Sequence, residues 1–294
     1  MPQGRALSPN RAAACRSCGS QRCEWLGDLP DSHQFAGLAL PTAIPGGALF
    51  QCPDCGLMFR SPTLTPNEYN RLYAEGSVKL WINESGVLRG DQKLVKSYIE
   101  AQRPHGAKVL DIGCSTGEFL SSLAFKYEKC GIENSVGAIR RCRERGIRVV
   151  GEDLYEISRL EEKFDVVTAM DVIEHTLNPG QFLQCVLHLL ADDGIALITT
   201  GDADNRIWRK LKSAFWYCRP AEHISFVSER WLKSNAGANG FRISHLQRFK
   251  YDHMSHFKLF GKLCLIHCLP LIGMQSKTWN AHLSADHLFV ALRN

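Results

Sequence analysis

The sequence predicts an α/β fold in which a doubly wound, mostly parallel sheet of seven strands follows a small N-terminal module. From about residue 105 of the 294-residue chain, short apolar runs alternate with helical stretches, which is typical of such a sheet. Two Cys-x-x-Cys pairs lie before this alternation begins. With 45% hydrophobic residues, the chain can bury the core of one large or two modest domains.

The N-terminal module carries four cysteines at the spacing of a metal site. Cys15-Arg-Ser-Cys18-Gly and Cys52-Pro-Asp-Cys55-Gly each place two thiols to hold one ion, and the glycine allows a tight turn beneath it. We therefore expect a zinc ribbon whose ion is structural, because four protein ligands leave no open position. A redox pair is the alternative, but it would leave the second pair unexplained. Cys23 is a nearby fifth thiol that could be confused with a ligand.

The chain is expected to divide into four segments. Residues 1–12 lack periodicity and are expected to be disordered. Residues 13–62 form the zinc ribbon, and residues 63–104 form a helical linker or lid whose first helix starts at Thr65-Pro-Asn-Glu68. Residues 105–294 form the sheet domain.

The segment Val109-Leu-Asp-Ile-Gly-Cys-Ser-Thr-Gly117 predicts a buried strand that runs into a ligand-binding turn. Gly113 and Gly117 permit the turn and the close approach of a ligand to the main chain. Asp111 would repel a pyrophosphate, but it would attract a ligand that carries ammonium and sulfonium groups. Glu133 ends the next strand, where its carboxylate can accept the hydroxyls of a ribose.

This pattern resembles the class I S-adenosylmethionine (SAM)-dependent methyltransferases, whose first motif is usually written D-x-G-x-G-x-G. Ser115 replaces the middle glycine of that motif. Five motifs occur in the expected order over residues 105–294, and a Rossmann-like domain that lacks this cofactor is the alternative. The resemblance implies that Asp153 lies against the adenine amino group and that Asp171, at the end of the fourth strand, is a cofactor-binding residue.

The loops after the fourth and fifth strands are expected to line the methyl-acceptor pocket. They hold His175 and the segment Arg219-Pro-Ala-Glu-His-Ile-Ser-Phe226, which resembles the P-E-H-L-S-x-F segment of many small-molecule methyltransferases. Because an alcohol or carbon acid must lose a proton, His223 and His175 are candidate catalytic bases, with Glu222 as an orienting or proton-accepting partner. Alternatively, both histidines are structural. A divalent metal at this loop is disfavoured, because few carboxylates lie nearby.

The resulting prediction is an enzyme that methylates a hydroxyl or carbon of a small molecule. A cysteine ribbon ahead of this core, with the tail Cys55-Gly-Leu-Met-Phe-Arg-Ser-Pro that follows it, resembles enzymes acting on sugar nucleotides and glycans. One alternative is an RNA methyltransferase, but residues 1–60 hold five arginines, no lysine and four acids, and an RNA-binding module should be plainly basic. Another is a non-catalytic scaffold that kept the fold. A dehydrogenase is disfavoured by Asp111.

The rest of the sequence constrains location and partners only broadly. No apolar run approaches the length of a membrane span, and the first residues lack an apolar signal segment, so a cytoplasmic protein is expected. The net charge of +5 predicts neither a membrane nor a nucleic-acid partner. Residues 254–274 are apolar and helical in pattern; a substrate cap, a dimer face and a membrane-surface helix all fit them. Tyr69, Tyr73 and Trp81 could contact cofactor or substrate, or could merely pack the ribbon against the core.

Overall fold

The structure is a computed structural model that describes residues 12–76, 87–152, 154–250 and 285–294. The expected tail, except for residue 12, lies outside these ranges. So do Trp81, Asp153 and the apolar stretch 254–274. No helix in the described ranges is long and apolar enough to cross a membrane.

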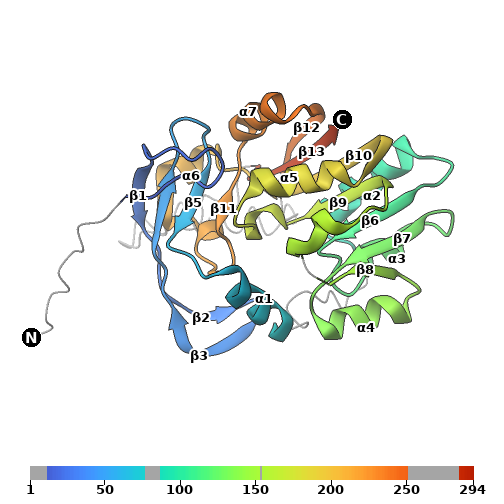
Figure 1. Cartoon of the computed structure of the whole chain (residues 1–294), viewed down its shortest axis with the longest axis horizontal. Coiled ribbons are helices and arrows are strands. Elements are labelled where there is room, and N and C mark those ends of the chain that lie inside the picture. The colour runs from blue at the N-terminus through green and yellow to red at the C-terminus, as the bar shows by residue number, and fades with distance from the viewer. Residues whose placement is uncertain (1–11, 77–86, 153, 251–284) are drawn as a thin grey trace, which may run out of the picture.

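The N-terminal module is a small antiparallel sheet that includes one strand from a distant part of the chain. Its order is β1(Glu24–Asp28), β4(Ala48–Gln51), β5(Met58–Ser61) and β11(Ser225–Phe226). Figure 1 shows β11, in orange, beside the blue β5. A separate hairpin consists of β2(Ser32–Phe35) and β3(Leu38–Ile44). The sequence pattern did not predict β11, because a two-residue strand has no periodicity and exists only through its pairing.

The main sheet has seven strands, as predicted. In spatial order they are β12(Arg242–Phe249), β13(His287–Arg293), β10(Leu190–Gly201), β9(Phe164–Met170), β6(Lys108–Ile112), β7(Glu128–Ile132) and β8(Arg148–Gly151). The five strands from β10 to β8 run parallel, whereas β13 is antiparallel to both of its neighbours. The prediction of an antiparallel final strand is confirmed.

Helices cover both faces of this sheet because alternate strand residues point to opposite sides. One face packs against α2(Gly90–Gln102), α3(Glu118–Ser122) and α4(Val136–Glu144). The other packs against α5(Pro179–His188) and α7(Glu229–Asn239). The remaining helices are α1(Pro66–Glu75), α6(Arg206–Leu211) and the short 3-10 turns η2(Leu154–Arg159), η3(Ile173–His175), η4(Lys212–Ala214) and η5(Trp216–Cys218). Thr65 and Glu68 form a capping box at α1, which confirms the predicted helix start.

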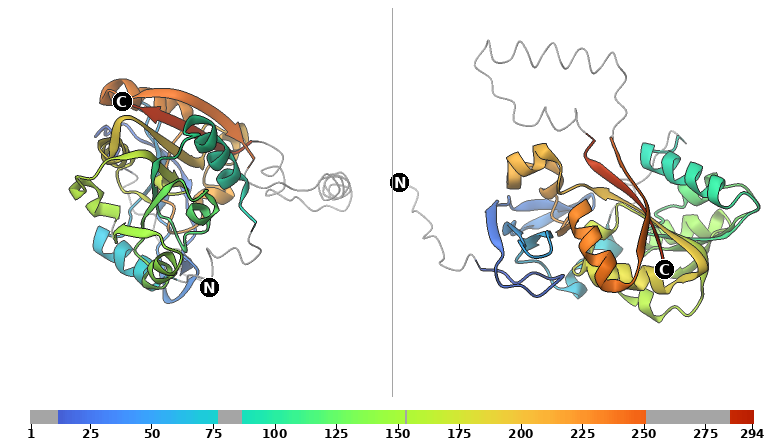
Figure 2. Two further views of the ribbon diagram at one scale, coloured as in Figure 1. Left: turned by 90° about the vertical axis from the view of Figure 1, so that its right-hand side faces the viewer. Right: turned by 90° about the horizontal axis from the view of Figure 1, so that it is seen from above.

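The N-terminal module is packed onto the sheet domain and shares its core. Cys52 and Phe59 belong to the same buried apolar cluster as Trp231 of α7. The Trp231 indole nitrogen donates to Ser17 Oγ at 3.0 Å, and Arg230 Nη2 donates to the carbonyl of Pro53 at 2.7 Å. Helix α7 therefore contacts the turn between the two cysteines of each pair. The right-hand view of Figure 2 shows the blue module at one side of the molecule and the green part of the sheet domain at the other.

Candidate functional site

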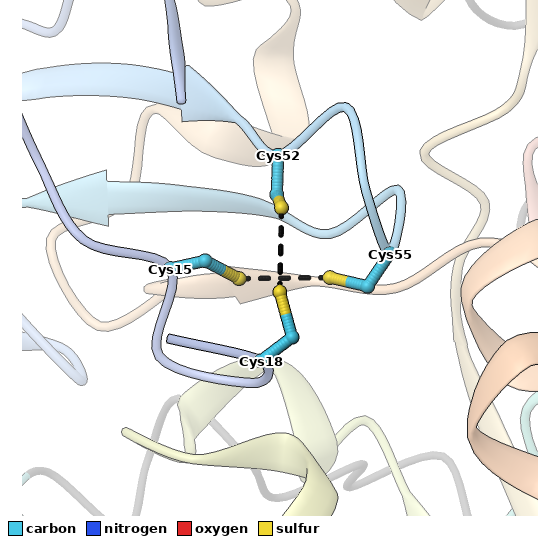
Figure 3. Close-up of side chains that lie close together, drawn as sticks. All are labelled: Cys15, Cys18, Cys52 and Cys55. Carbon is cyan, nitrogen blue, oxygen red and sulfur yellow. Dashed lines mark hydrogen bonds between the residues drawn. The ribbon is translucent and has the colours of Figure 1, made fainter. Parts of the chain in front are cut away.

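The four predicted cysteines converge in the N-terminal module (Figure 3). Cys15 and Cys55 have their sulfurs 3.5 Å apart, as do Cys18 and Cys52, and all four sulfurs lie within 4.8 Å of one another. Zinc–sulfur bonds of about 2.3 Å in a tetrahedron place the sulfurs about 3.8 Å apart, so the cluster has the size of a zinc site. The hydrogen bond from Cys55 lowers the pKa of Cys15 to about 5, which supplies a thiolate at neutral pH. Cys23 is not part of the cluster.

A second candidate site is a cavity at the carboxyl ends of β6, β7 and β9. The residues that line it come from these strand ends and from the α1–α2 region, and they include Tyr73, Arg89, Gly113, Ser115, Glu133 and Asp171. Ligands of open α/β sheets bind at this edge. The structure thus brings together five of the seven predicted cofactor residues: Asp111, Gly113, Ser115, Glu133 and Asp171. Tyr69 does not line the cavity; it is buried against Phe35.

The turn after β6 has the backbone geometry expected of a ligand-binding loop. Gly113 and Gly117 have φ angles of 72° and 80°, which favour glycine. A Cβ on Gly113 would lie 2.9 Å from Val172 Cγ2. Ser115 adopts φ 50° despite its side chain. Its buried hydroxyl has no hydrogen-bond partner within the described part of the chain, although it belongs to a cavity-lining residue. A ligand with a polar group could satisfy this hydroxyl.

Glu133 ties this turn to the end of β7. Its Oε2 accepts from the backbone nitrogen of Ser115 at 2.8 Å, and its Oε1 accepts from Asn134 and Ser135 at 3.1 and 2.9 Å. Burial raises the pKa of the Glu133 carboxyl, whereas these three donors favour its ionised form. Because each carboxylate oxygen has two lone pairs, Oε2 retains one acceptor position for a ligand.

Asp111 is a buried acid at the base of the cavity. Only 2% of its surface is exposed, and Thr168 Oγ1 donates to its Oδ1 at 2.6 Å. Burial raises the pKa of Asp111 to about 7. A cationic ligand would offset that burial and favour the carboxylate, so the site is suited to bind positive charge.

Arg89 and Gln92 also line the cavity, and neither was predicted from the sequence. Arg89 Nη2 lies 2.6 Å from Asp91 Oδ2 and 3.4 Å from Asp171 Oδ2. Burial, followed by the charge of Glu174, raises the pKa of Asp171 to about 6. No sequence signal identifies Arg89 as a cavity residue, because its contact with Asp171 depends on the placement of α2 over the end of β9.

The two predicted histidines lie side by side. Their ring centroids are 4.9 Å apart. His223 Nδ1 lies 2.6 Å from the carbonyl oxygen of Tyr217, and His175 Nδ1 lies 3.0 Å from that of Glu222 and 2.8 Å from the Tyr73 hydroxyl. A carbonyl only accepts, so a proton on each Nδ1 makes these bonds and leaves the Nε2 lone pairs available. Burial and neighbouring His175 hold the pKa of His223 well below its usual value.

Glu174 lies beneath this pair, and both of its carboxylate oxygens accept hydrogen bonds. The Tyr217 hydroxyl donates to Oε1, and Thr200 Oγ1 donates to Oε2 at 3.0 Å. Ligand atoms of Glu174, His175 and His223 lie within 4.8 Å of one another. These two hydrogen bonds tie the loop after β9 to Tyr217 of η5 and Thr200 of β10. The contact of Glu222 with His175 is made by the Glu222 backbone carbonyl.

A doubly wound seven-stranded sheet with an antiparallel final strand and an acid-lined cavity at its carboxyl edge defines the class I methyltransferase fold. Residues 89–246 match the family model described as a methyltransferase domain. The chain belongs to this family of SAM-dependent methyltransferases.

Relatives of the chain carry different methyltransferase names. A ubiquinone biosynthesis O-methyltransferase of Azorhizobium caulinodans is 28% identical over 166 residues, which cover 50% of this chain and 63% of that protein. An (S)-coclaurine N-methyltransferase of Papaver somniferum is 32% identical over 114 residues, covering 34% of this chain and 32% of that protein. The matches therefore span less than two thirds of either relative's length.

A solved structure supports the fold. The 1,6-didemethyltoxoflavin-N1-methyltransferase of Burkholderia thailandensis, crystallised with 1,6-didemethyltoxoflavin and S-adenosylhomocysteine, has a TM-score of 0.50 and 16% identity, and the alignment covers 83% of this chain and 98% of that chain.

Proposed function

We propose that this protein is a methyltransferase that moves a methyl group from SAM to a hydroxyl or carbon of a small molecule. The observation that carries the proposal is the cavity that combines Asp111, Glu133 and Ser115 at one strand edge, where the Ser115 hydroxyl has no hydrogen-bond partner among the described residues. When bound, SAM supplies an activated methyl group on a sulfonium. The protein must then position the acceptor and remove its proton.

The residues around the cavity fit such a cofactor. The free acceptor position on Glu133 Oε2 suits a ribose hydroxyl, and the Ser115 hydroxyl can bond a polar group beside it. Asp111 suits a cationic ligand, since positive charge nearby would favour its ionised form. The assignment of Asp153 to the adenine rests on the resemblance alone. Asp171, held by Arg89, is proposed to close the acceptor side of the cavity.

The histidine pair is the proposed proton acceptor. His175 lines the cavity, and the ring of His223 packs against the ring of His175. A depressed pKa keeps His223 neutral, so an Nε2 lone pair can take a proton from a hydroxyl or an acidic carbon. Glu222 would orient His175 through its backbone carbonyl.

We further propose that the four-cysteine cluster binds one structural zinc ion. The size of the cluster and its four cysteine sulfurs suit zinc, and four ligands would leave no open position for catalysis. A cytoplasmic location, where thiols stay reduced, suits this site. The acceptor class is proposed from the sequence resemblance: a sugar nucleotide or glycan, which offers many hydroxyls.

The test is a calorimetric titration of the purified protein with SAM and with S-adenosylhomocysteine, with zinc determined on the same sample. Micromolar binding and one zinc per chain are expected. Absence of binding by a correctly folded, zinc-loaded protein would contradict the methyltransferase proposal and favour a scaffold role.

A further inference from the structure

Arg60 of β5 is a fully buried arginine in the N-terminal module. Its side chain is 2% exposed. Its guanidinium donates five hydrogen bonds, all to backbone carbonyl oxygens. The acceptors are Gly46 at 2.6 Å, Cys218 at 2.9 Å, Arg219 at 3.3 Å, Pro220 at 2.9 Å and His223 at 3.1 Å.

Four of these five carbonyls belong to residues 218–223, the segment that ends at His223. The main chain of Arg60 binds the same region, since its nitrogen donates to Ile224 at 2.8 Å. The next residues pair as β5 and β11, with Ser225 opposite Phe59. Side chain and backbone of one module residue therefore hold a segment about 160 positions away in the sequence.

The same segment reaches the histidine pair. The carbonyl of Glu222 contacts His175 Nδ1, and the nitrogen of Ile224 donates to the carbonyl of Glu174 at 2.8 Å. Residues 218–224 thus lie between the module on one side and η3 on the other. Displacing this segment would move His223 away from His175.

The contacts at position 60 require the geometry of an arginine side chain. A guanidinium presents five N–H donors in one rigid plane, and its buried charge is offset by converging carbonyl dipoles. A lysine at position 60 would keep the charge, but its single nitrogen could not reach acceptors spread around a plane.

We propose that Arg60 is a positioning residue through which the N-terminal four-cysteine module holds the segment 218–223, and with it His223, at the acceptor side of the site. This proposal rests on the proposed function. It makes the module part of the active-site architecture, whatever else the module binds.

The positive charge of Arg60 also contributes to the lowered pKa of His223. The titratable groups around the His223 ring come from several elements, and they are Arg60 of β5, Glu174 and His175 of η3, Tyr217 of η5 and His287 of β13. A positive charge at Arg60 disfavours a second positive charge on the imidazole. Removing it should raise the pH at which His223 becomes protonated.

The experiment compares the full-length, metal-loaded wild type with Arg60→Lys and Arg60→Met. Arg71→Met, which removes an exposed arginine on α1, is the control. Hydrogen exchange of residues 218–224 should accelerate about tenfold or more in both Arg60 variants. Metal content and SAM affinity should stay within about twofold of the wild type, because Asp111 and Glu133 lie at other elements.

A second readout separates positioning from general stability. In NMR titrations of ring-labelled histidine, assigned with His223→Gln, His223 should titrate at a higher pH in Arg60→Met than in the wild type. In Arg60→Lys, which keeps the charge, the pH at which His223 titrates should lie between those of Arg60→Met and the wild type. In Arg71→Met it should match the wild type. With an identified acceptor, kcat should fall while the KM for SAM is unchanged.

Unchanged exchange in residues 218–224 and an unchanged His223 titration would overturn the proposal. If Arg60→Met fails to fold, the exchange and titration data of Arg60→Lys decide whether the proposal holds. A wild type that does not bind SAM would refute the proposed function, while the exchange and titration data would still decide whether Arg60 positions His223.

Discussion

Replacing Asp111 with asparagine tests whether ionisation of this buried acid lowers the stability of the ligand-free protein. The pKa of Asp111 is raised from 3.8 to about 7 by burial. Between these values the folded protein binds a proton that the unfolded chain has released. Stability therefore falls as the pH rises from about 4 to about 7. Asparagine has the same shape, cannot ionise, and can still accept the hydrogen bond from Thr168 Oγ1.

The magnitude follows from the size of the shift. At 1.36 kcal/mol per pKa unit, the ionisation penalty is about 1.5 kcal/mol at pH 5 and about 4 kcal/mol at pH 8. The stability of Asp111→Asn relative to the wild type should therefore increase by about 2.5 kcal/mol between these pH values. With an unfolding entropy of about 2.1 cal/mol/K per residue, this corresponds to about 4 °C in Tm for a chain of this length.

The assay is urea and thermal unfolding of both proteins without SAM at the two pH values. Asp192→Asn, at an exposed position, is the control and should show no such change. A stability difference between Asp111→Asn and wild type that is the same at both pH values would refute the reasoning. In the wild type, SAM affinity should rise about tenfold from pH 6 to pH 8, and in Asp111→Asn it should be lower and insensitive to pH over this range.

Three further substitutions test the remaining assignments. Glu133→Gln should weaken SAM binding about tenfold or more, because a neutral amide is a poorer acceptor for the turn nitrogens and for a hydroxyl; unchanged calorimetric affinity would exclude Glu133 from the site. Cys52→Ser should release the metal and destabilise the module by several kcal/mol, whereas one zinc per chain retained in elemental analysis would count against the four-cysteine ligand set. His223→Gln should leave SAM affinity unchanged and lower kcat by about 10²-fold to 10⁴-fold; full turnover on the true acceptor would assign the base elsewhere.

The local patterns in the sequence predicted the main sheet, the four cysteines that converge and five of the residues that line the cavity. Strands β6 to β10 could be predicted because each contains a short apolar stretch, and these stretches alternate with helical patterns along the chain. The cofactor turn could be predicted because Asp111, Gly113 and Gly117 lie within one short segment. The four cysteines could be grouped because each pair has metal-ligand spacing, and their sulfurs do converge.

Only the tertiary structure decided how these parts hold one another. Arg60 and Arg89 look like ordinary charged residues in the sequence. In the structure, however, Arg60 donates to carbonyls of residues 218–223, and Arg89, which pairs locally with Asp91, also lies 3.4 Å from Asp171 beyond β9. The pairing of β5 with β11 joins residues too far apart for any periodicity to reveal. The physical reason is that a buried charge or a two-residue strand is stabilised by acceptors and partners that only chain folding brings within about 3 Å, so its role is a property of the packed protein and not of a sequence window.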